Sequence, residues 1–146
     1  MTESDGISFT RNFAAPRELV YEAWTTPQHF AAWWGGSTVT VPDDSVAMDV
    51  RAGGTWKATM IIGNGIPDMN WFGEFLEVDP PAKLVMTLAD RPGDEREIVT
   101  ATFTDVDGGT EMSFSQTGGH MTAEEYERTA QGWQGFFDAM QSIVEK

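Results

Sequence analysis

The sequence predicts an α+β fold in which an antiparallel sheet is covered by one long C-terminal helix. The first observation is that apolar and polar residues alternate in a series of short segments, which is the period of strands with one buried face. The second is that the apolar period changes from two to about 3.6 residues after Gly119, which indicates a helix. Strands and a helix that each carry one apolar face bury those faces by packing together.

The N-terminal part of the chain is expected to form a strand and two short helices. Residues 7–13 alternate between apolar and polar side chains and predict the first strand. Pro16 begins a helix, which carries the apolar residues Leu19, Val20, Ala23 and Trp24. A second helix begins at Thr26, which is expected to accept a backbone N–H bond as the N-cap, and Pro27 suits the first helical position.

Two adjacent tryptophans, Trp33 and Trp34, end this second helix and are followed by two glycines that stop it. Neighbouring residues on a helix point about 100° apart, so the two indoles cannot share one narrow stripe. One indole can face the core. The other then requires a second apolar surface, which a cavity, a partner or a neighbouring loop would supply.

About six further strands are expected between the short helices and the C-terminal helix. They are residues 46–51, 55–62, 71–78, 84–88, 98–104 and 110–116. Turn-forming residues separate them, notably Gly53-Gly54, Gly63-Asn64-Gly65, Asp79-Pro80-Pro81 and Asp107-Gly108-Gly109.

The last helix is expected to begin near Thr122, which forms a capping-box pattern with Glu125. Its apolar stripe has spacings of four and three and consists of Tyr126, Ala130, Trp133, Phe137, Met140 and Val144. Gly132 and Gly135 lie inside this helix, where each costs about 1 kcal/mol relative to alanine. Two interpretations are open: close approach of a strand or of the short helices, or space for a ligand or a bend in the helix.

Composition limits the classes of function. The 9 basic and 23 acidic residues give a net charge of -14, which argues against nucleic acid and anionic membranes as partners. The chain has no cysteine, which excludes disulfides, thiol nucleophiles and cysteine metal sites and suits a cytoplasmic protein. The N-terminus does not resemble a signal peptide, and no apolar run approaches the ~20 residues that span a bilayer.

The 146 residues predict one domain, with an ordered core from about residue 7 to residue 145. His29 and His120 are isolated from each other and from acidic spacing patterns, so no metal site is expected. Serines lack the sequence context of a nucleophile, and the paired glycines lack a phosphate-binding pattern, so no cofactor is expected.

Five motifs, in this order, resemble a known family. They are APRELVYEAWTTP (residues 15–27), WWG (33–35), MDVRAGGTW (48–56), the segment 73–81 that ends in VDPP, and GW (132–133). From about residue 7 to the C-terminus, the chain is similar to the activator of heat-shock-protein-90 ATPase homologue family, within the START-like (SRPBCC) helix-grip superfamily.

This resemblance implies a curved antiparallel sheet that grips the C-terminal helix. It also implies a cavity between sheet and helix, which in related families holds lipids, sterols or polyketides. The family takes its name from a eukaryotic co-chaperone domain, and many members are small proteins of unassigned role. It supplies no catalytic residues to carry over.

The candidate ligand-binding residues are Trp34, Met48, Trp56, Met60, Trp71, Glu74, Met86, Trp133 and Phe137. Methionine and tryptophan form an adaptable lining for an apolar ligand, although the same residues are also suited to filling a core. Glu74 shares a face with Phe72, Leu76 and Val78, whereas Glu77 lies on the opposite face. Glu74 is therefore the candidate polar group in the pocket.

The leading hypothesis is a protein that binds a hydrophobic small molecule in this pocket and has no assigned reaction. One alternative is an enzyme of the aromatase or cyclase type, which would require a buried titratable group. Another is a co-chaperone-like interaction module, which would require an exposed apolar patch, with Trp33 as the candidate. The sequence does not decide the oligomeric state, and a homodimer is one of the open alternatives.

Overall fold

The computed structural model of the protein describes residues 6–36, 39–89, 96–118 and 122–145. Its helices and strands are β1 (Gly6–Phe13), α1 (Arg17–Thr25), α2 (Pro27–Trp33), the short 3-10 helix η2 (Asp43–Ser45), β2 (Ala47–Met48), β3 (Thr55–Met60), β4 (Met69–Asp79), β5 (Lys83–Leu88), β6 (Glu97–Val106), β7 (Gly109–Thr117) and α3 (Ala123–Val144). The predicted α+β class and element order are confirmed.

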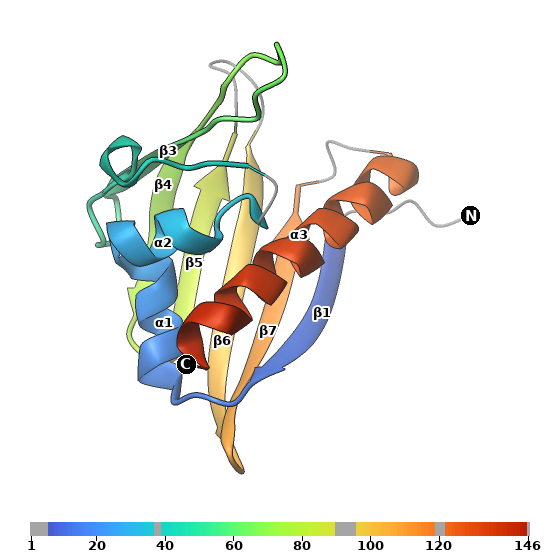
Figure 1. Ribbon diagram of the computed structural model, residues 1–146. Coiled ribbons are helices and arrows are strands. Elements are labelled where there is room, and N and C mark those ends of the chain that lie inside the picture. The colour runs from blue at the N-terminus through green and yellow to red at the C-terminus, as the bar shows by residue number, and fades with distance from the viewer. Residues whose placement is uncertain (1–5, 37–38, 90–95, 119–121, 146) are drawn as a thin grey trace.

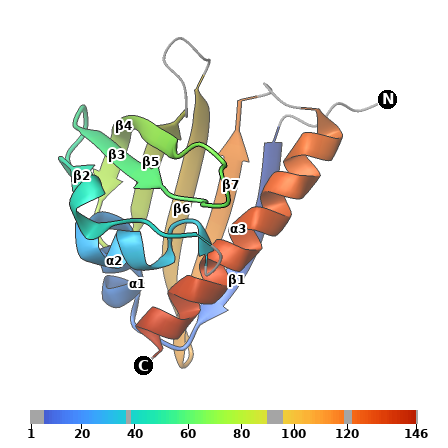
Figure 2. The same cartoon turned by 45° about the horizontal axis from the view of Figure 1, so that its top comes forward.

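Within the described residues, seven antiparallel strands form one sheet in the order β1-β7-β6-β5-β4-β3-β2. The sheet curves around α3, which crosses its inner face diagonally (Figures 1 and 2). The helices α1 and α2 cover the same side of the sheet near the C-terminal end of α3 (Figure 1). This is the helix-grip arrangement, with the core between the sheet and the three helices.

The helix α3 begins as the sequence predicts. The Thr122 hydroxyl accepts from the backbone N–H of Glu125, and the Glu125 carboxylate accepts from the backbone N–H of Thr122. Helix α2 begins differently, because the side chain of Thr26 makes no capping bond. Thr26 ends α1 as well as beginning α2, and its own N–H donates to Glu22. Thr26 is therefore the N-cap of α2, as expected, but its side chain does not accept the expected backbone N–H bond.

The strand expected over residues 46–51 is shortened to Ala47–Met48. A tight turn replaces its second half, in which the Gly54 N–H donates to the carbonyl of Arg51. Gly54 is required there, since a Cβ atom at this position would lie 1.9 Å from the carbonyl oxygen of Asp49. The turn leaves β2 as a very short edge strand.

A β-bulge in β4 changes which residues face the core. Phe75 pairs with Met86, but Glu77 pairs with Val85, so β4 carries one extra residue between these pairs. The extra residue resets the alternation of faces. Glu77 therefore lies on the outer face, as Glu74 does, and Val78 turns toward the core. The predictions that Glu74 and Glu77 face opposite sides and that Val78 shares the face of Glu74 are wrong.

No helix among the described residues is long and apolar enough to cross a membrane.

Candidate functional site

Most of the predicted pocket residues gather between the sheet and the helices. Trp34 lies at the centre and is 2% exposed. Its ring centroid lies 5.6 Å from that of Trp56 on β3, 5.9 Å from that of Trp71 on β4 and 5.3 Å from that of Trp133 on α3. We call the following rings the aromatic cluster: Trp24, Phe30, Trp33, Trp34, Trp56, Trp71, Phe114, Trp133, Phe136 and Phe137.

The predicted methionines surround this cluster. Met60 and Met86 are buried in the same core, and Met48 on the edge strand is half-buried against it. Met60 lies beside Gly35, where its methyl carbon would be 3.0 Å from an added Cβ atom. Eight of the nine candidate residues therefore face the core, and all of them except Met48 lie on or around the aromatic cluster.

Trp33 is buried as completely as Trp34, on a different side. It is 0% exposed, its indole N–H donates to the carbonyl of Ala23 at 2.7 Å, and its ring packs on Trp24 of α1. Helix α1 supplies the second apolar surface that the tandem tryptophans require. The expectation that Trp33 forms an exposed apolar patch is wrong.

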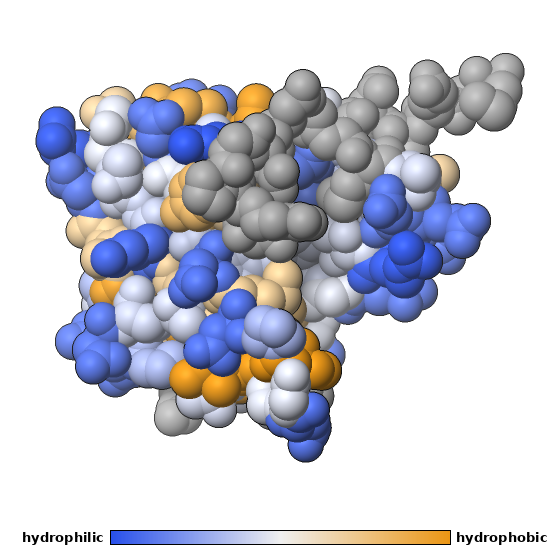
Figure 3. Space-filling model, turned by 90° about the horizontal axis from the view of Figure 1, so that it is seen from above, coloured by the Kyte–Doolittle hydropathy of each residue, from blue (hydrophilic) through white to orange (hydrophobic). Residues whose placement is uncertain are grey.

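The larger exposed apolar side chains are instead spread over several elements. They are Leu19, Ile61, Ile66, Leu76, Ile98 and Val106. The view from above shows hydrophobic areas separated by hydrophilic residues (Figure 3).

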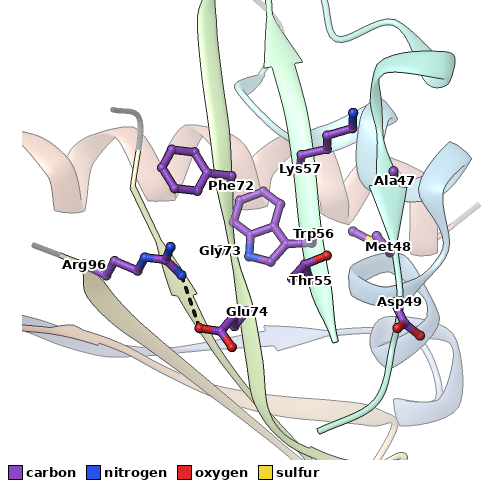
Figure 4. Close-up of a pocket in the computed structure, with 10 residues that line it drawn as sticks. All are labelled: Ala47, Met48, Asp49, Thr55, Trp56, Lys57, Phe72, Gly73, Glu74 and Arg96. Carbon is purple, nitrogen blue, oxygen red and sulfur yellow. Dashed lines mark hydrogen bonds and ion pairs between the residues drawn. The ribbon is translucent and has the colours of Figure 1, made fainter. Parts of the chain in front are cut away.

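Glu74, the ninth candidate, does not face the aromatic cluster. Its side chain is 49% exposed on the outer face of the sheet, and its Oε1 lies 3.4 Å from a guanidinium nitrogen of Arg96 (Figure 4). The face that Glu74 shares with Phe72 and Leu76 is the solvent side of β4, where Leu76 is 48% exposed. The expectation that Glu74 is the inward polar group is wrong.

The buried carboxylate is Glu97, the first residue of β6, which is 7% exposed. Its Oε1 accepts from the hydroxyl of Tyr126 on α3 at 2.8 Å and from the side-chain amide of Gln116 on β7 at 3.0 Å. The amide oxygen of Gln116 accepts from the indole N–H of Trp133 at 2.7 Å. These four side chains, which we call the Glu97 network, join the aromatic cluster to a carboxylate.

The sequence contains a signal for Glu97. Val99, Ala101 and Phe103 are the buried residues of β6, and one further step of two residues along the strand reaches Glu97. The strand predicted from the sequence begins at residue 98, because glutamate is rarely found in a protein core. Gln116 follows Met112 and Phe114 on the buried face of β7 in the same way.

Three indole N–H groups of the aromatic cluster carry no hydrogen bond in the described structure. The Nε1 atoms of Trp34 and Trp71 are buried and have no acceptor in the described structure, as is also the case for Trp24. A buried donor without an acceptor costs about 1–3 kcal/mol. A ligand that brings an acceptor oxygen to Trp34 or Trp71 would recover part of that cost.

The two glycines of α3 do not face the sheet. Both lie on the exposed side of the helix, and no heavy atom of the described residues lies within 4 Å of a Cβ built on either. They line an outer hollow of about 400 Å³ together with Gly35 and Gly36. Because a Cβ atom would meet open space at both positions, close approach of a strand or of the short helices does not explain either glycine, and the space beside them lies on the outer side of α3.

The sequence model of one protein family matches residues 14–145, and that family is described as Activator of Hsp90 ATPase homolog 1-like protein. The chain belongs to this family. The resemblance inferred from the sequence motifs is therefore confirmed. Comparison with curated proteins gives no match.

Three solved structures have the same fold as this chain. Protein CV1439 from Chromobacterium violaceum has a TM-score of 0.86 at 24% identity, covering 97% of this chain and 98% of its own. The AHSA1-like protein from Aeromonas hydrophila has a TM-score of 0.78 at 24% identity, covering 96% and 92%. SA2116 from Staphylococcus aureus, described as of unknown function, has a TM-score of 0.81 at 19% identity, covering 99% and 94%.

The described part of this family member shows no group of three or more histidine, cysteine, aspartate or glutamate side chains able to hold a metal ion. His29 lies near one carboxylate, with its Nδ1 3.5 Å from an Oε1 atom of Glu22. His120 lies outside the described residues.

Tyr21 gives a test of the core at alkaline pH. Burial, and secondarily the charge of Asp79, raises the pKa of Tyr21 from 10.0 to about 12. The native state therefore holds the phenol proton of Tyr21 more tightly than the unfolded chain does. As the pH rises from about 10 to about 12, the unfolded chain loses this proton first, and the free energy of unfolding decreases.

The Tyr21 hydroxyl is buried without a hydrogen-bond partner. We therefore expect Tyr21→Phe to change the free energy of unfolding at neutral pH by less than about 0.5 kcal/mol. Its loss of stability above pH 10 should be shallower than that of the wild type. Urea denaturation across the alkaline range measures both effects, and identical pH profiles for the two proteins would contradict the assignment.

Proposed function

We propose that this protein binds an apolar small molecule between the sheet and α3, against the aromatic cluster and beside the Glu97 network. The observation that carries the proposal is the position of Glu97, a buried carboxylate beside the aromatic cluster in a core that is mostly apolar. A buried charge is expensive to keep, so its presence at the edge of the cluster calls for a role beyond packing.

The residues proposed to contact the ligand are Trp34, Met60, Trp71, Met86, Trp133 and Phe137, with Trp56 and Met48 farther toward the sheet edge. The unpaired N–H groups of Trp34 and Trp71 favour a ligand that carries a carbonyl, carboxyl or hydroxyl oxygen. The Glu97 network favours a hydroxyl or other donor at the opposite end. This chemistry suits hydroxylated polyketides, sterols and fatty acids.

The rings of the aromatic cluster pack closely, with centroid separations such as 4.6 Å between Phe114 and Trp133. Entry of a ligand therefore requires side chains to rearrange. Met60 and Met86 are suited to this, because an unbranched thioether side chain adopts several rotamers at low cost. A ligand that buries its apolar surface gains ~25 cal/mol per Å², less the cost of its lost freedom.

The proposal extends to the setting in which the protein acts. We propose a single cytoplasmic domain with a small-molecule partner and no nucleic-acid partner. The net charge of -14 and the absence of cysteine support this view.

The test is a tryptophan-fluorescence titration with fatty acids, sterols and aromatic polyketide mimics. We expect at least one class to quench fluorescence, because six tryptophans are present and most surround the proposed site. Glu97→Gln should weaken binding of hydroxylated ligands by about tenfold, as expected for a lost charge-assisted hydrogen bond.

Glu74→Gln is the matched control, since it makes the same chemical change on the outer face of the sheet. It should leave ligand binding to the aromatic cluster unchanged. Equal effects of the two substitutions, or no quenching by any ligand class, would contradict the proposal.

A second candidate function rests on the 2.8 Å contact between Glu97 and the Tyr126 hydroxyl. A carboxylate and a phenol at this distance can move a proton. In a cyclase-type reaction, Glu97 would take a proton from a substrate carbon that lies between two carbonyl groups. That carbon would then attack a third carbonyl group of the same substrate and close the ring. The new alkoxide would take the Tyr126 proton, and Glu97 would return its own proton to Tyr126. Recovery of a ring-closed product after incubation with a polyketide mimic distinguishes this function from binding alone.

A further inference from the structure

The outer face of the sheet carries a hollow of about 520 Å³ over β2, β3 and β4, and Arg96, the residue before β6, reaches across it (Figure 4). Its outer apolar surface comes from Phe72. Met48 and Trp56 also line it, but both face the core. This volume falls within the range of small-molecule sites.

Two cations flank the aromatic ring in this hollow. Lys57 is the cross-strand partner of Phe72, so its side chain lies beside the ring on the outer face. The guanidinium carbon of Arg96 lies 5.3 Å from the centroid of the Phe72 ring on the other side. Lysine, phenylalanine and arginine therefore form a short row across the sheet (Figure 4).

The two carboxylates at the hollow are already paired. Asp49 accepts from Arg51 at 2.8 Å, and Glu74 lies 3.4 Å from Arg96. The side chain of Lys57 forms no hydrogen bond or ion pair within the described residues, although the chain has a net charge of -14. The uncompensated charge of the hollow is therefore positive.

A second, smaller hollow of about 330 Å³ shares Lys57 and Phe72 with the first. It is also lined by Thr59 and Asn70, whose side chains bond to each other at 2.9 Å. Lys57 and Phe72 thus stand between two depressions, and a ligand longer than one ring has room on both sides of them.

We propose that this outer hollow is a second binding site, which takes a small aromatic carboxylate. The carboxylate would pair with Lys57 and with the exposed edge of the Arg96 guanidinium. The ring would lie on Phe72. Lys57, Phe72 and Glu74 lie on the outer face of the sheet, opposite Glu97 and α3, so the inference does not rest on ligand binding between the sheet and α3.

The test is a titration of isotope-labelled protein with 2-naphthoate, followed by amide proton–nitrogen NMR. We expect the largest shift changes at residues of β3 and β4 around Lys57, Phe72 and Gly73. Lys57→Gln and Arg96→Gln should each raise the dissociation constant by about three- to fivefold, the range for exposed charge pairs. The neutral analogue 2-naphthamide should bind more weakly than 2-naphthoate.

Two control substitutions are expected to leave the affinity for 2-naphthoate unchanged or to increase it. Lys83→Gln removes a lysine that is paired with Glu77 outside the hollow and should leave the affinity unchanged. Glu74→Gln frees Arg96 from its carboxylate partner and should tighten binding about twofold. The proposal is overturned if naphthoate shifts residues of the aromatic cluster instead, if it binds no better than naphthamide, or if Lys57→Gln and Lys83→Gln behave alike.

Discussion

Replacing Trp133 with alanine is expected to lower the free energy of unfolding by about 3–5 kcal/mol, the cost of removing a large buried aromatic side chain. Trp133 is 4% exposed and lies at the middle of α3. Its ring contacts those of Trp24, Trp34 and Phe114, with centroids 6.2, 5.3 and 4.6 Å away. The substitution also removes the donor to Gln116 and so breaks the Glu97 network.

Thermal and urea denaturation measure this loss of stability. Gln131→Ala is the matched control, because Gln131 lies two residues away on the exposed side of the same helix. It should leave the midpoint nearly unchanged. An unchanged midpoint for Trp133→Ala would mean that α3 does not pack on the sheet through this residue.

Glu97→Ala is expected to lower the free energy of unfolding by about 2–6 kcal/mol, since two buried donors lose their acceptor at about 1–3 kcal/mol each. The hydroxyl of Tyr126 and the amide of Gln116 both donate to the same carboxylate oxygen. Removal of the carboxylate leaves them inside a layer that water reaches poorly. The loss should be partly reversed in Glu97→Gln, whose amide oxygen still accepts.

Glu74→Ala provides the comparison for this result. The Glu74 side chain is 49% exposed and its one ion pair is long, so its loss should change stability by less than about 0.5 kcal/mol. Urea denaturation of the three variants and the wild type gives the ranking. Equal stabilities for Glu97→Ala and Glu74→Ala would show that the Glu97 network contributes nothing to the fold.

Periodicity predicted the architecture because each element has one face that must leave water. The stripe from Tyr126 to Val144 and the capping box at Thr122 were enough to place α3. The alternation of β3, β5, β6 and β7 placed the strands. In these elements the local pattern and the tertiary packing agree, so the sequence alone was sufficient.

The polar part of the site could not be placed with the same rules. A bulge between Phe75 and Glu77 adds one residue to β4, and nothing in a period-two pattern signals it. Glu97 is buried because Tyr126 and Gln116, each more than fifteen residues away in sequence, meet its carboxylate. These hydrogen bonds allow a glutamate to be buried, although glutamate usually faces water. Because their donors lie far away in the sequence, a single sequence does not reveal them.

The two tryptophans at the end of α2 show a similar limit. Periodicity indicated that Trp33 and Trp34 face different surfaces, which is correct. It could not show that α1 folds back to cover Trp33, because that depends on the angle between two short helices joined at Thr26.

The most direct test of the central claim is native mass spectrometry of the protein after incubation with an equimolar mixture of fatty acids, sterols and aromatic polyketide mimics. The chain alone has a mass of 16.1 kDa. We predict a single one-to-one adduct of one ligand class in the wild type, reduced in Glu97→Gln and retained in Glu74→Gln. A spectrum that contains only the mass of the bare chain, at ligand concentrations far above those of the protein, would contradict the claim that the sheet and α3 enclose a binding site.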